Sequence, residues 1–540
     1  VYVGGNAVVG GTIRFKKTST DVMYNEHPSS VFGAGNGNTS NNTIGTVYSS
    51  AVVIDGNAHV KGSVFGGGNY GGVGTTLEDD TESTIKILGG TIDESVYAGS
   101  NNNGGGNSAS NTCDMNIEMT GGTVGNIYGG SKVGGVVYGN STINVISGTV
   151  INDIYGGGEG GYASTSSRGT YVTGNINVNI GKSLAANVAK PVLNIGGSVY
   201  GGSAYGTVNG STENGSANTS LVTNVNVHYG NISKSVFGGG KGSSSLTPKV
   251  YGKVTVTVND GNIGNVYGGN DAKGQPAGSD VVILNGGTIG DAFGGGNSTG
   301  QNTTDIRLIG ATVNRLFGGS NASGDVTTTN VSMTGGTVTD VYGGNNVGTS
   351  TNTTNVNISG GTVNGDIYGG GLQAPVYSST NLTINNMTVK NVFGGGQSAD
   401  VHPASGTATA TTNVNITNSN GSKVFGGSNF LGTVDKSNVT INGTRFTSVY
   451  GGNNAGGTTS ATNVTINSGT FDYVYGGGDK ALSGDTVVLI NNATITDLFG
   501  GGNEAGIGKS DVDIIKGKIT NVYGGSNAAG DVTSTDVHIG

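Results

Sequence analysis

The residues of this chain that could do chemistry recur at regular intervals. In the first set, an aromatic residue follows an apolar residue and precedes two small ones, as in Val64-Phe65-Gly66-Gly67. Rings stacked about 5 Å apart, the spacing of neighbouring β-strands, could form a strip that binds sugars. Ten Tyr and eight Phe share the position, so no hydroxyl is required there, and a structural role is favoured. In the regular half of the chain this aromatic ladder comprises Phe293, Phe317, Tyr342, Tyr368, Phe393, Phe425, Tyr450, Tyr475, Phe499 and Tyr523.

The second set is a column of Asn or Asp residues upstream of each aromatic residue, as in Asn355-Val356-Asn357-Ile358. Aligned side-chain oxygens could bind a cation, and calcium is the candidate. The Gly-Gly-x-Gly-x-Asp nonapeptides of calcium-binding solenoids do not occur in order. We therefore favour a ladder of side-chain amides that bond along a stack of strands, and expect no cofactor. This predicted Asn/Asp ladder comprises Asn330, Asn355, Asn381, Asn413, Asn438, Asn463, Asp511 and Asp536.

A third column consists of Thr residues after paired glycines, as at Thr337 and Thr362. Flat Thr-x-Thr arrays could match an ice lattice, but the second position holds Asn314 in one copy and Lys390 in another. An array interrupted in this way favours ordinary β-branched filling of strands.

Catalysis has little support in the sequence. Some β-helical enzymes cleave acidic polysaccharides with clustered carboxylates, but the one local acidic run is Glu78, Asp79 and Asp80, near Lys86. The histidines are scattered without metal-ligand spacing; they are His27, His59, His228, His402 and His538. We therefore expect no enzymatic activity, no catalytic residue and no metal site, and keep a polysaccharide lyase or hydrolase as an alternative.

The elements that position these columns follow from composition. Gly accounts for 108 of 540 residues and charged residues for 11%, against usual shares of about 7% and 25%. Interior glycine disfavours helices, and so little charge and proline does not suit a disordered chain. The remaining class is an all-β chain whose turns are made largely by glycine.

Internal repetition makes this prediction more specific. The aromatic motif occurs 18 times, and from Phe293 to Tyr523 eight of nine intervals are 24 to 26 residues. The Val-x-Ile pattern alternates with the period of a β-strand, so its apolar pair faces one way. One repeat cannot bury that pair alone, whereas stacked repeats can. We predict a parallel β-solenoid with about 25 residues per coil and roughly 18 coils, right-handed because parallel crossovers nearly always are.

We divide the chain by the regularity of its repeats. Residues 1–30 form an irregular entry segment that opens with a weak aromatic copy, Val1-Tyr2-Val3-Gly4-Gly5. Residues 31–291 form variable coils and residues 292–540 form regular coils. The longest departures from the period, at 159–195, 203–233 and 397–412, are expected to leave the coil as loops, where solenoids tolerate insertions.

The net charge, the length of apolar runs and the cysteine count argue against nucleic-acid binding, membrane-spanning helices and internal disulfides. A net charge of −9 without a basic stripe argues against nucleic acid. No apolar run approaches the length of a membrane-spanning helix. Cys113 is the single cysteine, so no internal disulfide forms.

Coils such as Gly360-Gly361-Thr362-Val363-Asn364-Gly365-Asp366-Ile367-Tyr368-Gly369-Gly370-Gly371 resemble the Gly-rich β-solenoid repeats of adhesin-like bacterial surface proteins. The resemblance covers nearly the whole chain from about residue 31. It implies an exported, surface-attached or fibre-forming protein and carries over no binding residue.

We therefore expect an extracellular structural or adhesive rod from a bacterial surface. The first alternative is a glycan-binding module that uses one solenoid face or the loops within 159–233. The last residues match the opening of a coil and the first residues match the end of one. We accordingly expect that the chain continues in a longer protein or associates with copies of itself, end to end or along the rod.

Overall fold

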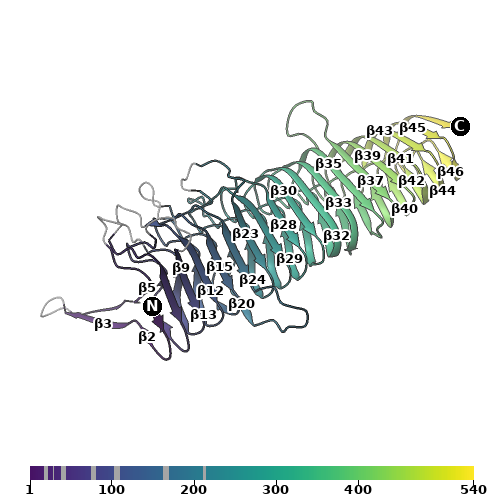
Figure 1. The fold of residues 1–540 in the computed structure, drawn as a ribbon. Coiled ribbons are helices and arrows are strands. Elements are labelled where there is room, and N and C mark those ends of the chain that lie inside the picture. Colours follow the sequence, from purple (N-terminus) through teal and green to yellow (C-terminus); the bar gives the residue numbers. More distant parts are fainter. Residues whose placement is uncertain are drawn as a thin grey trace. The chain divides into compact units, whose positions relative to one another are not determined.

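A computed structural model describes residues 1–16, 22–27, 29–37, 44–74, 81–101, 110–161, 169–210 and 215–540. The described residues form β-strands and no helix, which confirms the all-β prediction. They divide into two compact units, Val1–Asp280 and Val281–Gly540, whose strands are labelled in Figure 1.

The strands of the first unit are short. They are β1 (Tyr2–Val3), β2 (Val8–Val9), β3 (Gly11–Lys16), β4 (Val22–His27), β5 (Val31–Phe32), β6 (Ser50–Ile54), β7 (His59–Val60), β8 (Val64–Phe65), β9 (Glu82–Ile87), β10 (Thr91–Tyr97), β11 (Ser110–Asn111), β12 (Asp114–Met119), β13 (Thr123–Tyr128), β14 (Val136–Val137), β15 (Ser141–Val145), β16 (Gly148–Val150), β17 (Ile154–Tyr155), β18 (Tyr171–Val172), β19 (Ile176–Ile180), β20 (Leu193–Ile195), β21 (Val199–Tyr200), β22 (Thr207–Val208), β23 (Val222–Val227), β24 (Asn231–Phe237), β25 (Lys249–Val250), β26 (Lys253–Val258) and β27 (Asn262–Tyr267).

The strands of the second unit include much longer ones. They are β28 (Asp280–Leu284), β29 (Thr288–Phe293), β30 (Gln301–Leu308), β31 (Thr312–Phe317), β32 (Val326–Tyr342), β33 (Thr351–Val363), β34 (Asp366–Tyr368), β35 (Val376–Asn385), β36 (Asn391–Phe393), β37 (Thr411–Thr417), β38 (Asn420–Phe425), β39 (Thr433–Asn442), β40 (Thr444–Tyr450), β41 (Thr458–Ile466), β42 (Gly469–Tyr475), β43 (Leu482–Ile490), β44 (Ala493–Phe499), β45 (Ile507–Ile514), β46 (Gly517–Tyr523) and β47 (Val532–Ile539).

Equivalent strands of successive repeats pair in parallel and in register. β32 pairs with β33 so that Asn330 lies opposite Asn355, and β33 pairs with β35 so that Asn355 lies opposite Asn381. The same holds in the first unit, where β15 pairs with β19 and β19 with β23. This pairing of each repeat with the next fits the predicted β-solenoid.

The Val-x-Ile pattern forms these strands because its apolar pair points into the core. Val356 is 2% exposed and Ile358 is fully buried, while Asn357 between them is exposed. β33 continues through a glycine corner at Gly361, whose φ is 90°. This left-handed region strongly favours glycine, which explains the glycine at this position of the repeat.

The first unit departs from this plan at its edges. β3 and β4 form an antiparallel hairpin within the predicted entry segment. A separate parallel sheet joins β11, β14, β18, β22 and β25. The first unit therefore carries strands outside the main sheet.

The predicted long departures are shorter than expected. Within 159–195 and 203–233, strands β19 and β23 still pair with their neighbours, because their alternating apolar residues have a core to fill. Between residues 397 and 412, Val401 is buried and bridges to Val376 and Val434. Only the short segment after it projects, as the green loop in Figure 1.

The first predicted aromatic copy is also placed differently. Val1-Tyr2-Val3 was expected to match the aromatic motif, but β1 pairs with β6, so Tyr2 lies opposite Val53 and Val3 opposite Ile54. Tyr2 is 67% exposed. The short apolar-aromatic-apolar sequence satisfies both patterns, and the register assigns it to the Val-x-Ile column.

A pair of substitutions at neighbouring positions tests this strand phase. Val356→Asp places an unpaired charge between two coils, and should lower local stability by about 3 kcal/mol or more. Asn357→Asp changes the same charge on the solvent face and should have little effect. Native-state hydrogen exchange of the amides of β33 measures both, and equal damage from the two would show that the strand faces the other way.

Candidate functional site

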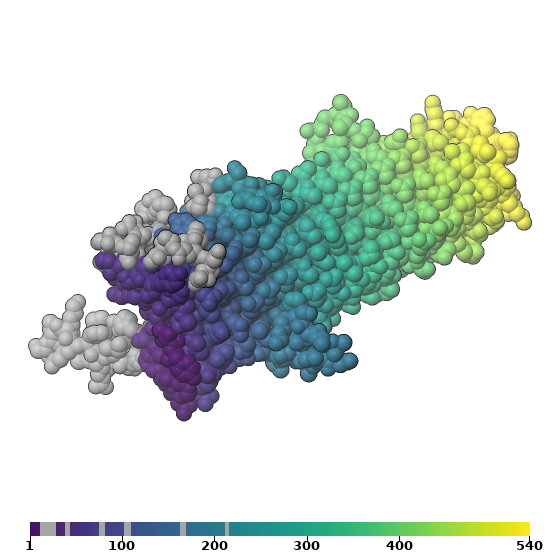
Figure 2. Space-filling view, viewed as in Figure 1, coloured from purple at the N-terminus to yellow at the C-terminus, as the bar shows by residue number. Residues whose placement is uncertain are grey.

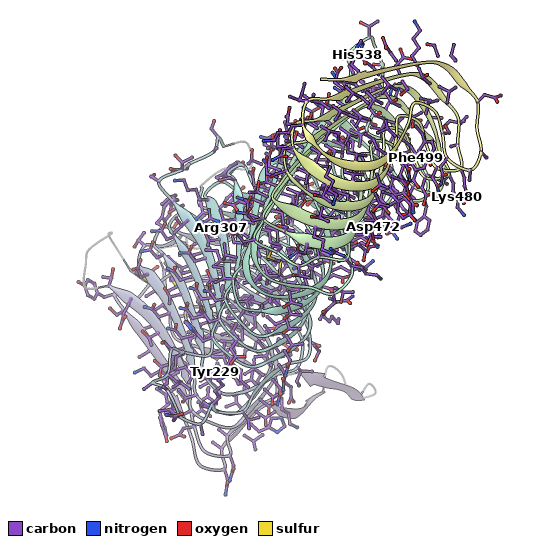
Figure 3. The ribbon with its side chains drawn as sticks, turned by 90° about the vertical axis from the view of Figure 1, so that its right-hand side faces the viewer. Tyr229, Arg307, Asp472, Lys480, Phe499 and His538 are labelled. Carbon is purple, nitrogen blue, oxygen red and sulfur yellow. The ribbon has the colours of Figure 1, made fainter. Side chains whose placement is uncertain are left out.

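The aromatic residues form continuous stacks in both units. Consecutive rings from Phe293 to Tyr523 lie 4.6 to 5.0 Å apart between centroids, with planes within 10° of parallel. The rings from Phe32 to Tyr267 in the first unit stack in the same way, 4.6 to 4.9 Å apart. Each ring contacts the equivalent ring of the next repeat, because the repeats are in register. Figure 3 shows the side chains, with Phe499 of this ladder labelled.

These rings are covered as well as stacked. From Phe293 to Phe499 each ring residue of the ladder is at most 5% exposed, whereas Tyr523 is 46% exposed. The Tyr342 hydroxyl donates to Gln397 Oε1 at 2.9 Å, and Asn429 Nδ2 donates to the Tyr368 hydroxyl at 3.0 Å. A buried ring with a neighbour on each face has no face left for a sugar.

Burial also removes the hydroxyls from acid–base chemistry. Burial raises the pKa of Tyr342 and of Tyr450 well above the usual range, and nearby carboxylates such as Asp340 and Asp479 add to the effect. Burial raises the pKa of Tyr475 to about 12. These phenols are therefore neutral at physiological pH and act as structural donors and acceptors.

The asparagines form a ladder of side-chain amides. Asn355 Nδ2 donates to Asn330 Oδ1 at 3.0 Å, and the same bond recurs from Asn381 to Asn355, Asn413 to Asn381, Asn438 to Asn413 and Asn463 to Asn438, at 2.9 to 3.0 Å. Every internal amide therefore donates to one neighbour and accepts from the other. The amide oxygens of Asn330, Asn355, Asn381, Asn413 and Asn438 each accept one of these bonds.

The last two predicted members of the column stand apart from the ladder. Val487 lies between Asn463 and Asp511 in the register, and Asp511 lies opposite Asp536. Valine has no amide, and two carboxylates offer each other no donor, so the bonding pattern ends at Asn463. Asp536 instead pairs with His538 at 3.3 Å.

The Thr column after the paired glycines faces outward but is interrupted. Thr312, Thr337 and Thr362 lie opposite one another in successive strands. In later repeats Asn420 and Arg445 occupy the column. The array thus lacks the continuity that an ice-binding surface would need.

The candidate catalytic groups that the structure describes lie apart from one another. Glu78, Asp79 and Asp80 lie outside the described residues, and Lys86 is exposed opposite Glu118 in the next strand. Three histidines each contact a single carboxylate: His59 contacts Asp93, His402 contacts Asp435 and His538 contacts Asp536. The side chain of His27 is not described. Among the described residues no group of three or more His, Cys, Asp or Glu side chains could hold a metal ion.

Sequence reasoning missed a fourth column, the Ser or Thr that precedes each Asn. Thr354 is fully buried, and its hydroxyl donates to the Gly369 carbonyl oxygen at 2.6 Å. The signal was in the sequence, because a hydroxyl occupies this position in successive repeats although it points inward. The equivalent donors are Thr304, Thr329, Thr380, Thr412, Ser437, Thr462 and Thr486.

The acceptor of this bond explains the glycine that follows each aromatic residue of the ladder in the second unit. A Cβ on Gly343 would lie 2.1 Å from the Gly369 carbonyl oxygen, and one on Gly394 would lie 2.2 Å from the Gly426 carbonyl oxygen. These glycines do not have positive φ. Close backbone approach, rather than a left-handed conformation, requires glycine here.

Comparisons with models of protein families, with curated proteins and with solved structures found no match. In the described part of the chain, no helix has the length and apolar character needed to cross a membrane.

The buried hydroxyl column can be tested at one repeat. Thr380→Val keeps the shape of the side chain but leaves the Gly394 carbonyl without its donor, and should cost about 1–3 kcal/mol locally. Thr380→Ser keeps the hydroxyl and should cost clearly less. Hydrogen exchange of the amides around β35 and β36 compares the two variants, and equal costs would show that the hydroxyl bond is unimportant.

Proposed function

We propose that this chain is an extracellular structural or adhesive rod, a repeat scaffold that forms part of a bacterial surface fibre or a large adhesin. One observation carries the proposal. The rings that recur once per repeat are buried against the rings of adjacent repeats, with centroids 4.6 to 5.0 Å apart in the second unit. The most regular residues of the chain are thus used to hold repeats together.

The proposed architecture is a right-handed parallel β-solenoid of roughly 18 coils, one for each aromatic motif. Right-handedness follows from the general preference of parallel β crossovers. Such a scaffold gains length simply by adding repeats, since each repeat contacts mainly its neighbours. A glycine-rich, weakly charged chain suits this role, because its stability comes from backbone ladders and stacked side chains rather than from a wide core.

The partners proposed for this rod are copies of itself, along or at the ends of the rod, and glycans or a host surface. Its outward strand positions support this proposal. In the second unit they present polar side chains such as Ser332, Asn357 and Thr383, in register on β32, β33 and β35. A long polar face of this kind gives a scaffold solubility together with many weak points of contact.

Localisation on intact source cells tests the proposal. Antibody raised against the purified chain should label cells that have not been permeabilised, and protease added outside those cells should remove the label. Antibody against a cytoplasmic protein serves as the control. Labelling only after permeabilisation would contradict a surface scaffold, as would cleavage of acidic polysaccharides by the purified chain.

A further inference from the structure

The first unit carries a loop that leaves the solenoid pattern and lines a cavity open to solvent. The loop joins β19 to β20 and spans residues 181–192, and it projects beside β20 in Figure 1 and as the blue protrusion in Figure 2. With the residues that follow β23 and β26 it borders an open cavity of about 560 Å³. This volume is in the range of sites that hold a small organic molecule.

The loop is anchored at both of its ends and along its length. Gly181 donates its backbone N–H to the Val145 carbonyl at 2.8 Å, and Gly148 donates to the Val192 carbonyl at 3.0 Å. Lys190, which lines the cavity, forms an ion pair with Asp260. The cavity therefore exists before any ligand arrives, which lowers the entropic cost of binding.

Tyr229 is a buried residue of the cavity lining. It is 2% exposed, and its hydroxyl donates to the Ile146 carbonyl at 3.0 Å. Its ring packs so closely on Gly181 that a Cβ there would lie 2.9 Å from the ring. Tyr229 is labelled in Figure 3. Because its ring is covered, it supports the loop and does not itself stack on a ligand.

The charges around the cavity leave one cation uncompensated. Lys182 and Lys190 both line it, and Asp260 pairs with Lys190. Among the described residues Lys182 forms no ion pair. Burial lowers the pKa of His228, so this residue is neutral at physiological pH. In a chain with a net charge of −9, a cavity with one spare positive charge favours a monoanion.

The other residues that line the cavity are either apolar or polar without charge. Leu184, Ala185 and Val188 provide apolar contact, while Ser183 and Asn187 provide a hydroxyl and an amide. A sugar ring presents apolar C–H groups and hydroxyls together, and a hexuronate adds one carboxylate. We propose that this cavity binds a hexuronate residue of an acidic glycan, with its carboxylate on the Lys182 ammonium.

Isothermal titration calorimetry of the full chain with glucuronate tests this site. Glucuronate should bind, and Lys182→Gln should weaken its affinity about tenfold or more, since a charge-assisted hydrogen bond is lost. Lys234→Gln makes the same charge change on β24 outside the cavity, and should leave the affinity unchanged. Ala185→Trp, which fills the cavity without changing charge, should also abolish binding.

Two further probes test the contributions of the sugar ring and of its carboxylate separately. Glucose has the ring without the carboxylate and acetate has the carboxylate without the ring, and both should bind more weakly than glucuronate. Equal binding of acetate would overturn the assignment to a sugar. Absence of glucuronate binding, or binding that both Lys182→Gln and Ala185→Trp leave unchanged, would overturn the site. Neither result would affect the surface scaffold, which is tested by cell labelling.

Discussion

The structure depends on one constraint, that a residue in one repeat lies opposite the equivalent residue of the next. In the second unit this register places Phe393 on Phe425 and Asn413 on Asn438. The separation is set by backbone hydrogen bonds between parallel strands, at about 4.8 Å. Side chains that tolerate a copy of themselves at this distance are therefore favoured. Flat rings can stack at it, and amides can both donate and accept.

The same constraint explains which residues cannot continue a column of stacked, equivalent side chains. Two facing carboxylates, such as Asp511 and Asp536, have no proton to share, so the amide ladder does not extend to them. A side chain in place of Gly343 would meet the backbone of the next repeat at 2.1 Å. The choice of glycine, aromatic and amide at fixed positions is thus a consequence of stacking. The buried positions of the repeat are occupied by residues that hold the stack together, and the binding site proposed above lies instead at a departure from the repeat, the loop beside the 560 Å³ cavity.

Much of the fold could be predicted from the sequence, because stacked repeats place equivalent residues at a fixed interval along the chain. The alternation of Val356, Asn357 and Ile358 indicated the strand and its buried face. The buried hydroxyl of Thr354 escaped notice because threonine is also common on exposed strand faces. The sequence also left open whether the glycine after each ring needs positive φ or close approach, since both demand the absence of a side chain. The long intervals near Tyr200 were also ambiguous, because the length of an interval does not show which of its residues leave the coil. Strand β19 remains in the stack although its repeat is long, and only pairing reveals which residues leave it.

Removal of one whole repeat tests the register most directly. Deletion of residues 330–354 joins Thr329 to Asn355, and Asn355 occupies in its repeat the position that Asn330 occupies in the repeat before it. The account predicts that this variant folds with the β-type circular dichroism of the parent and an unfolding temperature within a few degrees of it. Deletion of residues 330–341 removes about half a repeat, shifts every later column out of register and should abolish cooperative unfolding of the second unit. If the two deletions behaved alike, in-register stacking would not be what holds this fold together.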